Sequence, residues 1–595
     1  MSVAYVIEAE TKDRKYDGIE PVVFLDRTEK PGMNIPFLLE RLKKLGSSRA
    51  VFVAEQNVDA HLELAVEIKK WMPSLEIVFD GPLPADTAAA ILREGRIDRY
   101  MNDVLSLWLD SDRVIRWSGR SEEKPGKQKT LLVLMPAWNN DFAPSGLAHI
   151  SAALQASGHQ VDVLDLNWVF WRLLRGKFKD TAEYESFLLW TKYKRYKEEA
   201  RPHLEVIFKE LKDKISNGQY RYVGFSLFET NLHPSRDAFR LIRRLHPDIK
   251  IFCGGPSSDV ERPFECNQMI EKNLIDAAVL GEGEVTVVEL LKMWSEGGNR
   301  AVDGAVVRSA AGAVLKGNTR PLANINQLPF PDFSGFNVYD YDQCMLPVYF
   351  SRGCVARCTF CSETEFWVRF RILKPDRVIE MIKRLMQDYG ITRFQFTDSL
   401  INGSHRHLEQ FADQVIEQKI KILFKGYCRL ESDLTAPLLA KLAKAGCDAL
   451  AFGMDSSNQR VTELMRKEVD VTKYGQIIKD TFAAGIKSTC CVIVGFPGET
   501  RDEFLETARA IEELGPYIEN LNISVPTLKK ISANERDMKA LGIRPKGLEA
   551  DKWETVDGSN TPKVRMSRFR LLQYVWSRTR KKPRTLAPSW IYRPA

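Results

Sequence analysis

Three cysteines gather in the stretch SRGCVARCTFCSE at positions 351–363. They are Cys354, Cys358 and Cys361, and their spacing is CxxxCxxC. Three thiolates can hold a [4Fe–4S] cluster while one iron stays open for another ligand. A structural zinc ion needs four ligands, and no CxxC or HxxxH pair near the motif supplies the fourth. The spacing therefore favours a cluster with one open coordination site over zinc.

The composition favours a soluble intracellular protein of several domains. The chain has 595 residues, 44% hydrophobic and 28% charged, and a net charge of +7, so neither a nucleic-acid nor a membrane partner is indicated. The first residues lack a signal-peptide pattern and no apolar run is long enough to span a bilayer. A cytoplasmic location is expected, where thiols stay reduced and clustered cysteines indicate metal or redox chemistry. The seven scattered cysteines are predicted to be small buried hydrophobes.

The elements that must position these cysteines alternate between strand and helix, which is typical of parallel α/β structure. An N-terminal α/β domain (1–120) contains predicted strands at 21–26, 49–55 and 75–80, and we assign it no role. A polar linker at 118–129 leads to a Rossmann-like domain (128–325) with a helical insertion (168–216) rich in Trp and Tyr. Ligands of such sheets bind beyond the carboxyl ends of the strands.

A third domain (340–530) repeats strand and helix six times, which predicts a partial (β/α)6 barrel. The cysteine motif follows its first strand, and the chemistry of such barrels lies at the strand C-termini. The C-terminal segment (531–595) shows no clear pattern until RFRLLQYVWSRTR.

With Phe360 before the last cysteine, the motif resembles that of radical S-adenosylmethionine (SAM) enzymes. In that family SAM chelates the open iron, and one electron cleaves SAM into methionine and a 5′-deoxyadenosyl radical that abstracts a substrate hydrogen. The resemblance thus implies a [4Fe–4S] cluster, SAM and an electron donor such as flavodoxin or ferredoxin. It makes Cys354, Cys358 and Cys361 the metal ligands and catalytic residues, and it places Phe360 near the adenine.

The same resemblance assigns SAM contacts to the ends of the later strands. Asp398 in FTDS lies where the family contacts the SAM amino group, and Arg429 in GYCRLES is suited to a carboxylate or phosphate. FGMDSS is similar to the family's FGxES pattern and implies that Asp455 and Ser456 lie near the ribose and carboxylate. VIVGFPGET resembles the fifth-strand motif, which implies that Gly495 packs near the adenine.

The domain before the barrel resembles the cobalamin-binding domain of one radical SAM subclass, through PSGLAHISAAL, VGFSLFETN, GGPSSD and LGEGE. The resemblance implies cobalamin contacts at strand ends and turns, namely Ser145, Gly146, Ser226, Gly254, Gly255, Gly281, Glu282, Gly283 and Glu284. The DxHxxG motif that supplies a cobalt-binding histidine in cobalamin mutases is missing, because the first loop reads AWNNDFAPSG. An inherited sheet that binds no cobalamin is the alternative.

Together these resemblances imply a cobalamin-dependent radical SAM enzyme that methylates an unactivated carbon of an unidentified substrate through the 5′-deoxyadenosyl radical and methylcobalamin. One alternative is non-methylating chemistry with the same cofactors, such as cyclisation, rearrangement or carbon–carbon coupling, with or without cobalamin. The other is a non-catalytic sensor or scaffold whose Fe–S cluster responds to redox state or iron.

Overall fold

The computed structural model describes residues 129–177, 186–259, 263–526, 532–545 and 552–579, together with seven short strands within residues 2–119. The chain divides into two compact units. The N-terminal unit comprises Met1–Lys127 with Asn337–Asp340 and Leu385–Ile391, and the main unit comprises the rest. The predicted α/β architecture is confirmed in the main unit, the described residues within 2–119 are strands, and the domain boundaries stay a prediction.

The N-terminal unit contains a seven-stranded sheet in the order β2-β1-β3-β4-β5-β6-β7. Its first five strands in this order pair in parallel, and β6 and β7 pair antiparallel. The predicted strands near 21–26, 49–55 and 75–80 correspond to β2, β3 and β4. The helix expected at 35–46 lies outside the described residues. The strand bounds are β1 (Ser2–Glu8), β2 (Glu20–Leu25), β3 (Ser47–Val53), β4 (Glu76–Asp80), β5 (Arg99–Met101), β6 (Leu105–Leu109) and β7 (Ile115–Gly119).

The first sheet of the main unit, here called the upstream sheet, has the order β14-β13-β12-β11-β10-β8-β9. The strands from β12 to β9 pair in parallel, and β13 and β14 form an antiparallel edge. The strand order reverses between β8 and β10, and in such doubly wound sheets ligands bind beyond the carboxyl ends at that point. The bounds are β8 (Lys129–Leu134), β9 (Gln160–Asp165), β10 (Tyr222–Ser226), β11 (Lys250–Gly254), β12 (Ala277–Val279), β13 (Ala305–Arg308) and β14 (Val314–Lys316).

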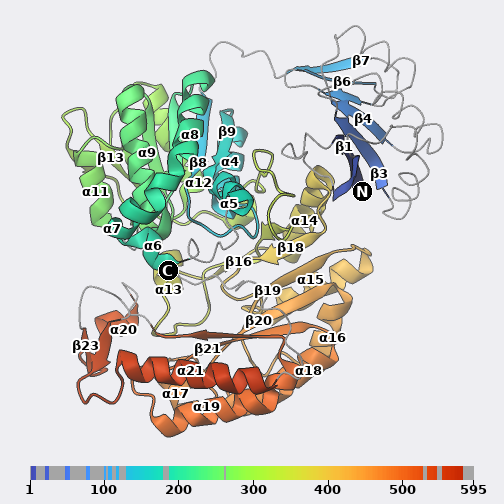
Figure 1. Cartoon of the computed structure of the whole chain (residues 1–595), viewed down its shortest axis with the longest axis vertical. Coiled ribbons are helices and arrows are strands. Elements are labelled where there is room, and N and C mark those ends of the chain that lie inside the picture. Colours follow the sequence, from blue (N-terminus) through green and yellow to red (C-terminus); the bar gives the residue numbers. More distant parts are fainter. Residues whose placement is uncertain are drawn as a thin grey trace. The chain divides into compact units, whose positions relative to one another are not determined.

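Helices cover the upstream sheet (Figure 1), and the longer ones are α4 (Ser145–Ala156), α5 (Leu166–Lys177), α8 (Glu205–Gly218), α9 (Leu232–Leu245), α11 (Pro263–Glu271) and α12 (Gly283–Ser295). Short turns of helix, including α6 (Phe187–Thr191), α7 (Tyr193–Arg195) and α10 (Pro256–Asp259), lie between them. Trp171, Trp190 and Tyr196 of the helical insertion are buried in the core of this sheet. Because of these buried rings, the insertion contributes mainly to packing, although its Tyr193 is 57% exposed.

The second sheet of the main unit forms the predicted six-stranded barrel wall, with the order β15-β18-β19-β20-β21-β22 and parallel pairing throughout. These strands are the six that the sequence predicted. Their bounds are β15 (Leu346–Val348), β18 (Arg393–Phe396), β19 (Leu423–Cys428), β20 (Cys447–Asp455), β21 (Lys487–Ile493) and β22 (Asn520–Ser524). A two-stranded ribbon of β16 (Ser351–Arg352) and β17 (Arg371–Ile372) leaves the first strand end.

Helices connect the barrel strands and turn their apolar faces to the sheet. Their starts are set locally: Thr500 and Glu503, for example, form a reciprocal capping box at the first turn of α19, which satisfies backbone N–H groups that have no partner within the helix. No described helix combines the length and the apolar character that crossing a membrane requires. The bounds are α13 (Glu363–Trp367), α14 (Pro375–Tyr389), α15 (His405–Glu417), α16 (Ala436–Lys444), α17 (Gln459–Leu464), α18 (Tyr474–Ala483) and α19 (Arg501–Leu514).

The C-terminal segment, which shows little pattern in the sequence, packs onto the end of the barrel. It contains α20 (Ala533–Arg536), a hairpin of β23 (Ile543–Pro545) and β24 (Trp553–Thr555), and α21 (Pro562–Thr579). Helix α21 lies along α19 and β22 (Figure 1).

Candidate cofactor site

The loop that carries the three cysteines follows the ribbon strand β16 and is held from two sides. The backbone N–H of Thr359 donates to Met465 O at 3.0 Å, and the N–H of Asn534 donates to Thr359 O at 2.9 Å. Within the loop, the N–H of Cys361 donates to Cys358 O at 3.2 Å. The barrel and the C-terminal segment together fix the middle of the motif.

The three thiols share one partly buried environment. Burial raises the pKa of all three thiols, to about 11 for Cys358 and about 12 for Cys361. Other thiols of the motif raise the pKa of these two cysteines further. Cys358 and Cys361 therefore lie close enough to other thiols of the motif for charge on one sulfur to disfavour charge on the next. A coordinating metal deprotonates thiols outright, so this arrangement fits a positively charged cluster.

The geometry is not that of a single ion. Among the described residues, no three His, Cys, Asp or Glu side chains converge as the ligands of one metal ion do. A [4Fe–4S] cluster instead takes its thiolates on different irons.

Phe360 lies in a small apolar cluster beside the motif. It packs against Val461, Met465 and Phe496, and its ring meets that of Phe496 edge to face at 6.2 Å between centroids. Helix α17 with Met465 after it, and the residues that follow β21, thus supply an apolar wall next to the last cysteine, as expected for a surface that receives an aromatic base.

Asp398 is predicted to contact SAM, but the structure gives its carboxylate partners within the protein. It accepts hydrogen bonds from the N–H groups of Phe350 and Ser351, at 2.9 and 2.5 Å, and from Ser351 Oγ at 2.6 Å. The side chain is buried, which raises its pKa to about 7 despite these donors. Asp398 therefore fastens the start of the ribbon to strand β18, and its part in SAM binding stays a prediction.

Charged side chains surround the cysteine loop at the ends of β19 and β20. Asp455 adopts a left-handed conformation with φ of 57° and forms a buried ion pair with Lys467, whose Nζ also donates to Gly453 O. Burial alone would lower the pKa of Lys467, but Asp455, together with Tyr474 and Cys358, outweighs burial and raises the pKa. Arg429 is ion-paired with Glu431 at 3.0 Å, while its Nε is buried without a hydrogen-bond partner among the described residues.

The sequence did not indicate Lys467 as a residue of the site. Its positive charge lowers the pKa of Cys358 and so partly offsets the effect of burial on that thiol. Lys467 stands in the stretch MRKEVD after α17, where a charged run ordinarily indicates a solvated surface. It is the one lysine that is buried among the described residues, and no periodicity in the sequence indicates this burial.

Ser456 and Gly495, the other predicted SAM contacts, take part in structural contacts. Ser456 is fully buried, with its hydroxyl 3.2 Å from that of Thr507. Gly495 has φ of 79°, and a Cβ there would lie 2.5 Å from Arg565 Cγ. The C-terminal helix α21 thus covers this glycine, so both assignments stay predictions.

The predicted cobalamin contacts lie at the carboxyl edge of the upstream sheet. Ser145 and Gly146 begin α4, and a Cβ at Gly146 would meet no atom of the described residues within 4 Å. Ser226 ends β10, and Gly254 ends β11. At Gly255, which has φ of 109°, a Cβ would lie 2.7 Å from Leu227 O, so only glycine permits this turn.

The Gly281–Glu284 turn joins β12 to α12, and its two acidic side chains point to arginines of the ribbon. Glu284 is ion-paired with Arg352 at 2.5 Å, and Glu282 is ion-paired with Arg371. Gly281 has φ of 65°, and a Cβ at Gly283 would lie 2.9 Å from Ile150 Cδ1 of α4. The glycines thus allow the turn, whereas a role of the carboxylates in cofactor binding stays a prediction.

The loop after β8 carries aromatic residues and no histidine. Trp138 lies 6.1 Å from Phe142 and 5.8 Å from Phe228 between ring centroids. Its carbonyl accepts a hydrogen bond from Trp171 Nε1, and its N–H donates to Asn167. This aromatic cluster lies at the switch point of the sheet and offers no imidazole.

Residues 348–511 match the Radical SAM superfamily. The chain contains a radical SAM domain. The matched residues begin at β15 and end in α19, so they include the cysteine loop and the ends of the barrel strands from β15 to β21. The radical SAM domain implies a [4Fe–4S] cluster and SAM as cofactors.

Three curated relatives extend the similarity beyond the radical SAM domain. An uncharacterized methyltransferase of Pyrococcus horikoshii is 25% identical over 51% of this chain and 66% of its own length. An anaerobic magnesium-protoporphyrin IX monomethyl ester cyclase of Rubrivivax gelatinosus is 23% identical over 53% of this chain and 58% of its own. Cytidylyl-2-hydroxyethylphosphonate methyltransferase of Streptomyces wedmorensis is 24% identical over 67% of this chain and 81% of its own. The alignments with the first two span less than two thirds of those relatives.

The fold is shared with a solved radical SAM methyltransferase, TsrM of Kitasatospora setae, whose structure holds cobalamin and a [4Fe–4S] cluster. The TM-score is 0.56 at 18% identity, over 74% of this chain and 85% of that one. At this identity the likeness shows the fold alone.

Proposed function

We propose that this protein is a cobalamin-dependent radical SAM methyltransferase that acts on an unactivated carbon. The observation that carries the proposal is the position of the three motif thiols in the fold. They lie at the carboxyl edge of a parallel barrel sheet, on a loop whose preceding ribbon contacts the ligand-binding edge of a doubly wound sheet. When bound, a cluster on these thiolates supplies an electron for the cleavage of SAM, and methylcobalamin supplies the methyl group.

The residues around the loop are suited to hold SAM. Arg429, whose Nε has no hydrogen-bond partner among the described residues, offers positive charge for its carboxylate, and Phe360, which packs on Phe496, offers an apolar wall for its adenine. The barrel around them would exclude water, which a reactive radical requires. An electron donor such as flavodoxin or ferredoxin would have to approach the cluster.

The upstream sheet is suited to hold cobalamin. Gly254 and Gly255 let a ligand approach the backbone beyond β10 and β11, and the open space at Gly146 lies on the same edge. Because the loop after β8 carries Trp138 and Phe142 where a histidine ligand would stand, we propose that the protein gives cobalt no imidazole from below. This favours methyl transfer as a radical.

The second candidate function is non-methylating radical chemistry with the same cluster and SAM, with or without cobalamin. The similarity to an anaerobic cyclase over about half of the chain favours it. The two candidates differ in products, because methylation consumes a second SAM and yields S-adenosylhomocysteine in addition to 5′-deoxyadenosine.

The test is anaerobic reconstitution with iron, sulfide and hydroxocobalamin, followed by spectra, metal analysis and mass spectrometry after addition of SAM and dithionite. We expect four irons per chain, retained cobalamin, and release of both 5′-deoxyadenosine and S-adenosylhomocysteine. Cys358→Ala should lose the cluster and reduce both products at least a hundredfold. The matched control is Cys344→Ala, a half-buried cysteine outside the motif, which should keep both.

Two results would contradict the proposal. If the protein binds zinc, or if the spectrum of its cluster does not change when SAM is added, radical SAM chemistry is excluded. Protein that cleaves SAM but binds no cobalamin and forms no S-adenosylhomocysteine would support the second candidate.

A further inference from the structure

We propose that Arg352, Arg371, Glu282 and Glu284 form a clamp that positions the cluster-binding loop against the cobalamin edge of the upstream sheet. The inference rests on the proposed function and adds a positioning role for four side chains. Two of them, Glu282 and Glu284, are the acidic residues of the turn after β12, and the other two are the arginines of the ribbon.

The ribbon geometry brings the two arginines to the same turn. Strands β16 and β17 pair antiparallel, with Arg352 opposite Arg371. Arg352 Nη2 lies 2.5 Å from Glu284 Oε1, and its Nη1 lies 3.5 Å from Glu282 Oε2. Arg371 Nη1 donates to Glu282 Oε2 at 3.0 Å, and its Nη2 makes a second ion pair with the same carboxylate. Both arginines therefore reach Glu282, and the four charges form one network.

Arg352 and Glu284 are buried, Arg371 and Glu282 are only slightly exposed, and aromatic rings lie beside the network. The exposed fractions of the four side chains range from 7% at Arg352 to 14% at Arg371. The Arg352 guanidinium lies 5.1 Å from the ring centroid of Tyr349 and 5.7 Å from that of Trp367. Tyr349 in turn meets His149 of α4 at 5.2 Å between centroids. The clamp thus links the ribbon with α4 as well as with the turn before α12.

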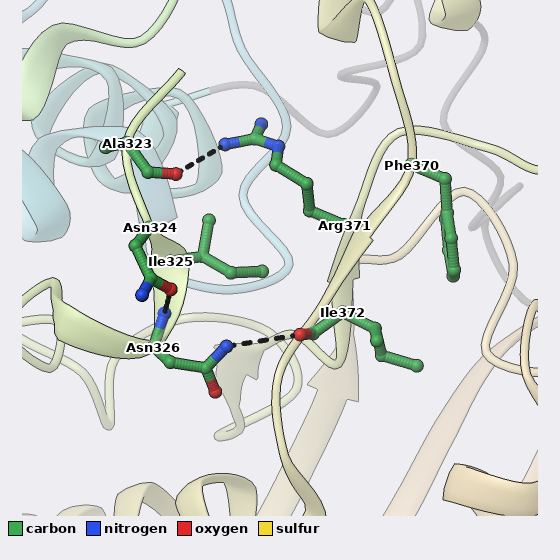
Figure 2. Close-up of a pocket in the computed structure, with 7 residues that line it drawn as sticks. All are labelled: Ala323, Asn324, Ile325, Asn326, Phe370, Arg371 and Ile372. Atoms are coloured by element: carbon green, nitrogen blue, oxygen red, sulfur yellow. Dashed lines mark hydrogen bonds between the residues drawn. The ribbon is translucent and has the colours of Figure 1, made fainter. Parts of the chain in front are cut away.

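The chain segment between the two sheets is tied to the same ribbon. Figure 2 shows Arg371 reaching the carbonyl of Ala323, and Asn326 Nδ2 donating to the carbonyl of Ile372. These residues line a hollow of about 340 Å³. The segment around Ala323–Asn326 and the Gly281–Glu284 turn therefore both contact the ribbon.

Burial of four charges indicates a role beyond stability. A buried ion pair often contributes no more stability than apolar residues of the same shape, but its geometry is directional. Gly353 and Cys354 directly follow Arg352, while Gly281 and Gly283 flank Glu282. A displacement of the clamp would therefore move the cluster ligands relative to the proposed cobalamin-binding turn, and radical transfer between two cofactors depends on their separation.

The experiment compares Arg352→Met with Arg460→Met, which removes a half-exposed arginine paired with Glu503 on the barrel exterior. Pulsed electron paramagnetic resonance on protein that holds reduced cluster and cob(II)alamin gives the distribution of the distance between them. We expect a broader distribution in Arg352→Met and an unchanged one in the control. An unchanged distribution in Arg352→Met would overturn the clamp.

A double variant, Arg352→Met with Glu284→Leu, separates positioning from stability. It leaves no uncompensated charge, so we expect a thermal midpoint near that of the wild type together with a broad distribution, because two apolar side chains have no directional preference. A distribution as narrow as that of the wild type would show that packing alone positions the loop, and would overturn the clamp.

Hydrogen exchange keeps the clamp testable if the wild-type protein binds no cobalamin, a result that would count against the proposed function alone. In cluster-loaded protein, amides of residues 349–353 should exchange at least tenfold faster in Arg352→Met than in the wild type, and Arg460→Met should match the wild type. Equal rates in all three proteins would overturn the clamp by itself.

Discussion

His149 illustrates how burial sets the charge of a single residue beside the site. Burial and then the nearby Arg352 lower its pKa to about 4, so the ring is neutral at pH 7. Its Nδ1 is buried without a hydrogen-bond partner among the described residues. An unfolded histidine has a pKa near 6.5, so the native and unfolded chains bind different numbers of protons between these values.

This difference predicts a loss of stability in mild acid. Between pH 6.5 and 4 His149 binds a proton in the unfolded chain but stays neutral in the native protein. The free energy of unfolding therefore falls as the pH falls through this window. From pH 7 to pH 5 the wild type should lose about 2 kcal/mol more than His149→Phe, at about 1.4 kcal/mol per pH unit below 6.5. Urea unfolding at both pH values measures this. Because the other titrating groups are common to both proteins, equal losses would show that His149 is protonated in the native state.

At the scale of the element, the β16–β17 ribbon depends on Gly353, which connects the clamp to the first cluster cysteine. Its φ of 85° is the left-handed region, and a Cβ there would lie 2.7 Å from Arg369 O. The partner is backbone just before the return strand β17, so it cannot move aside as a flexible side chain could. Only glycine lets the two strands approach so closely.

Gly353→Ala should therefore distort the ribbon and impair cluster assembly. The left-handed conformation alone costs alanine about 1–2 kcal/mol, and the close contact adds to it. We expect a lower thermal midpoint and fewer irons and sulfides per chain after anaerobic reconstitution.

The control is Gly475→Ala in α18, where a Cβ meets only Leu514 at an ordinary 3.7 Å. Alanine is favoured over glycine within a helix by about 0.5–1 kcal/mol, so this variant should keep its iron and its thermal midpoint. If Gly353→Ala kept the iron content of the wild type, the ribbon would not require glycine at position 353.

At the scale of the whole molecule, the C-terminal segment closes one end of the barrel. Asn560 Nδ2 donates to Gly495 O at 2.9 Å, and the Arg565 guanidinium lies 3.8 Å from the ring centroid of Trp553. Arg568 is ion-paired with Glu499 at 2.6 Å, and both side chains are buried. Residues without a recognisable sequence pattern thus complete the end of strand β21.

The Arg568–Glu499 pair allows a test of this closure. Burial raises the pKa of Glu499 to about 7 even with Arg568 beside it. Removing the cation in Arg568→Met breaks the buried pair, which should cost about 3–5 kcal/mol of stability at pH 9, and less at pH 7, where Glu499 takes up a proton instead. Chemical unfolding measures the loss. Arg570→Met on the exposed side of α21 should stay within about 0.5 kcal/mol of the wild type, and an equally small effect at Arg568 would exclude the closure.

The sequence by itself determined the elements and the cysteine motif. Alternating apolar runs and helical patterns predicted all six barrel strands, because strand and helix periodicity are local properties of the chain. The spacing of Cys354, Cys358 and Cys361 predicted the cluster, since ligands on one loop need no tertiary information. Asp398 was correctly placed just beyond a strand end, but its carboxylate turned out to hold the backbone of Phe350 and Ser351.

Only the tertiary structure decided which charges meet. Arg352 and Glu284 are 68 residues apart in sequence, and Lys467 lies in a charged run that resembles any solvated surface. Whether such side chains are buried and paired depends on which strand ends and turns come together, and this leaves no periodic trace in the sequence. The cofactor chemistry could therefore be predicted from residue types, whereas the positioning role that we propose rests on long-range ion pairs that only the folded chain creates.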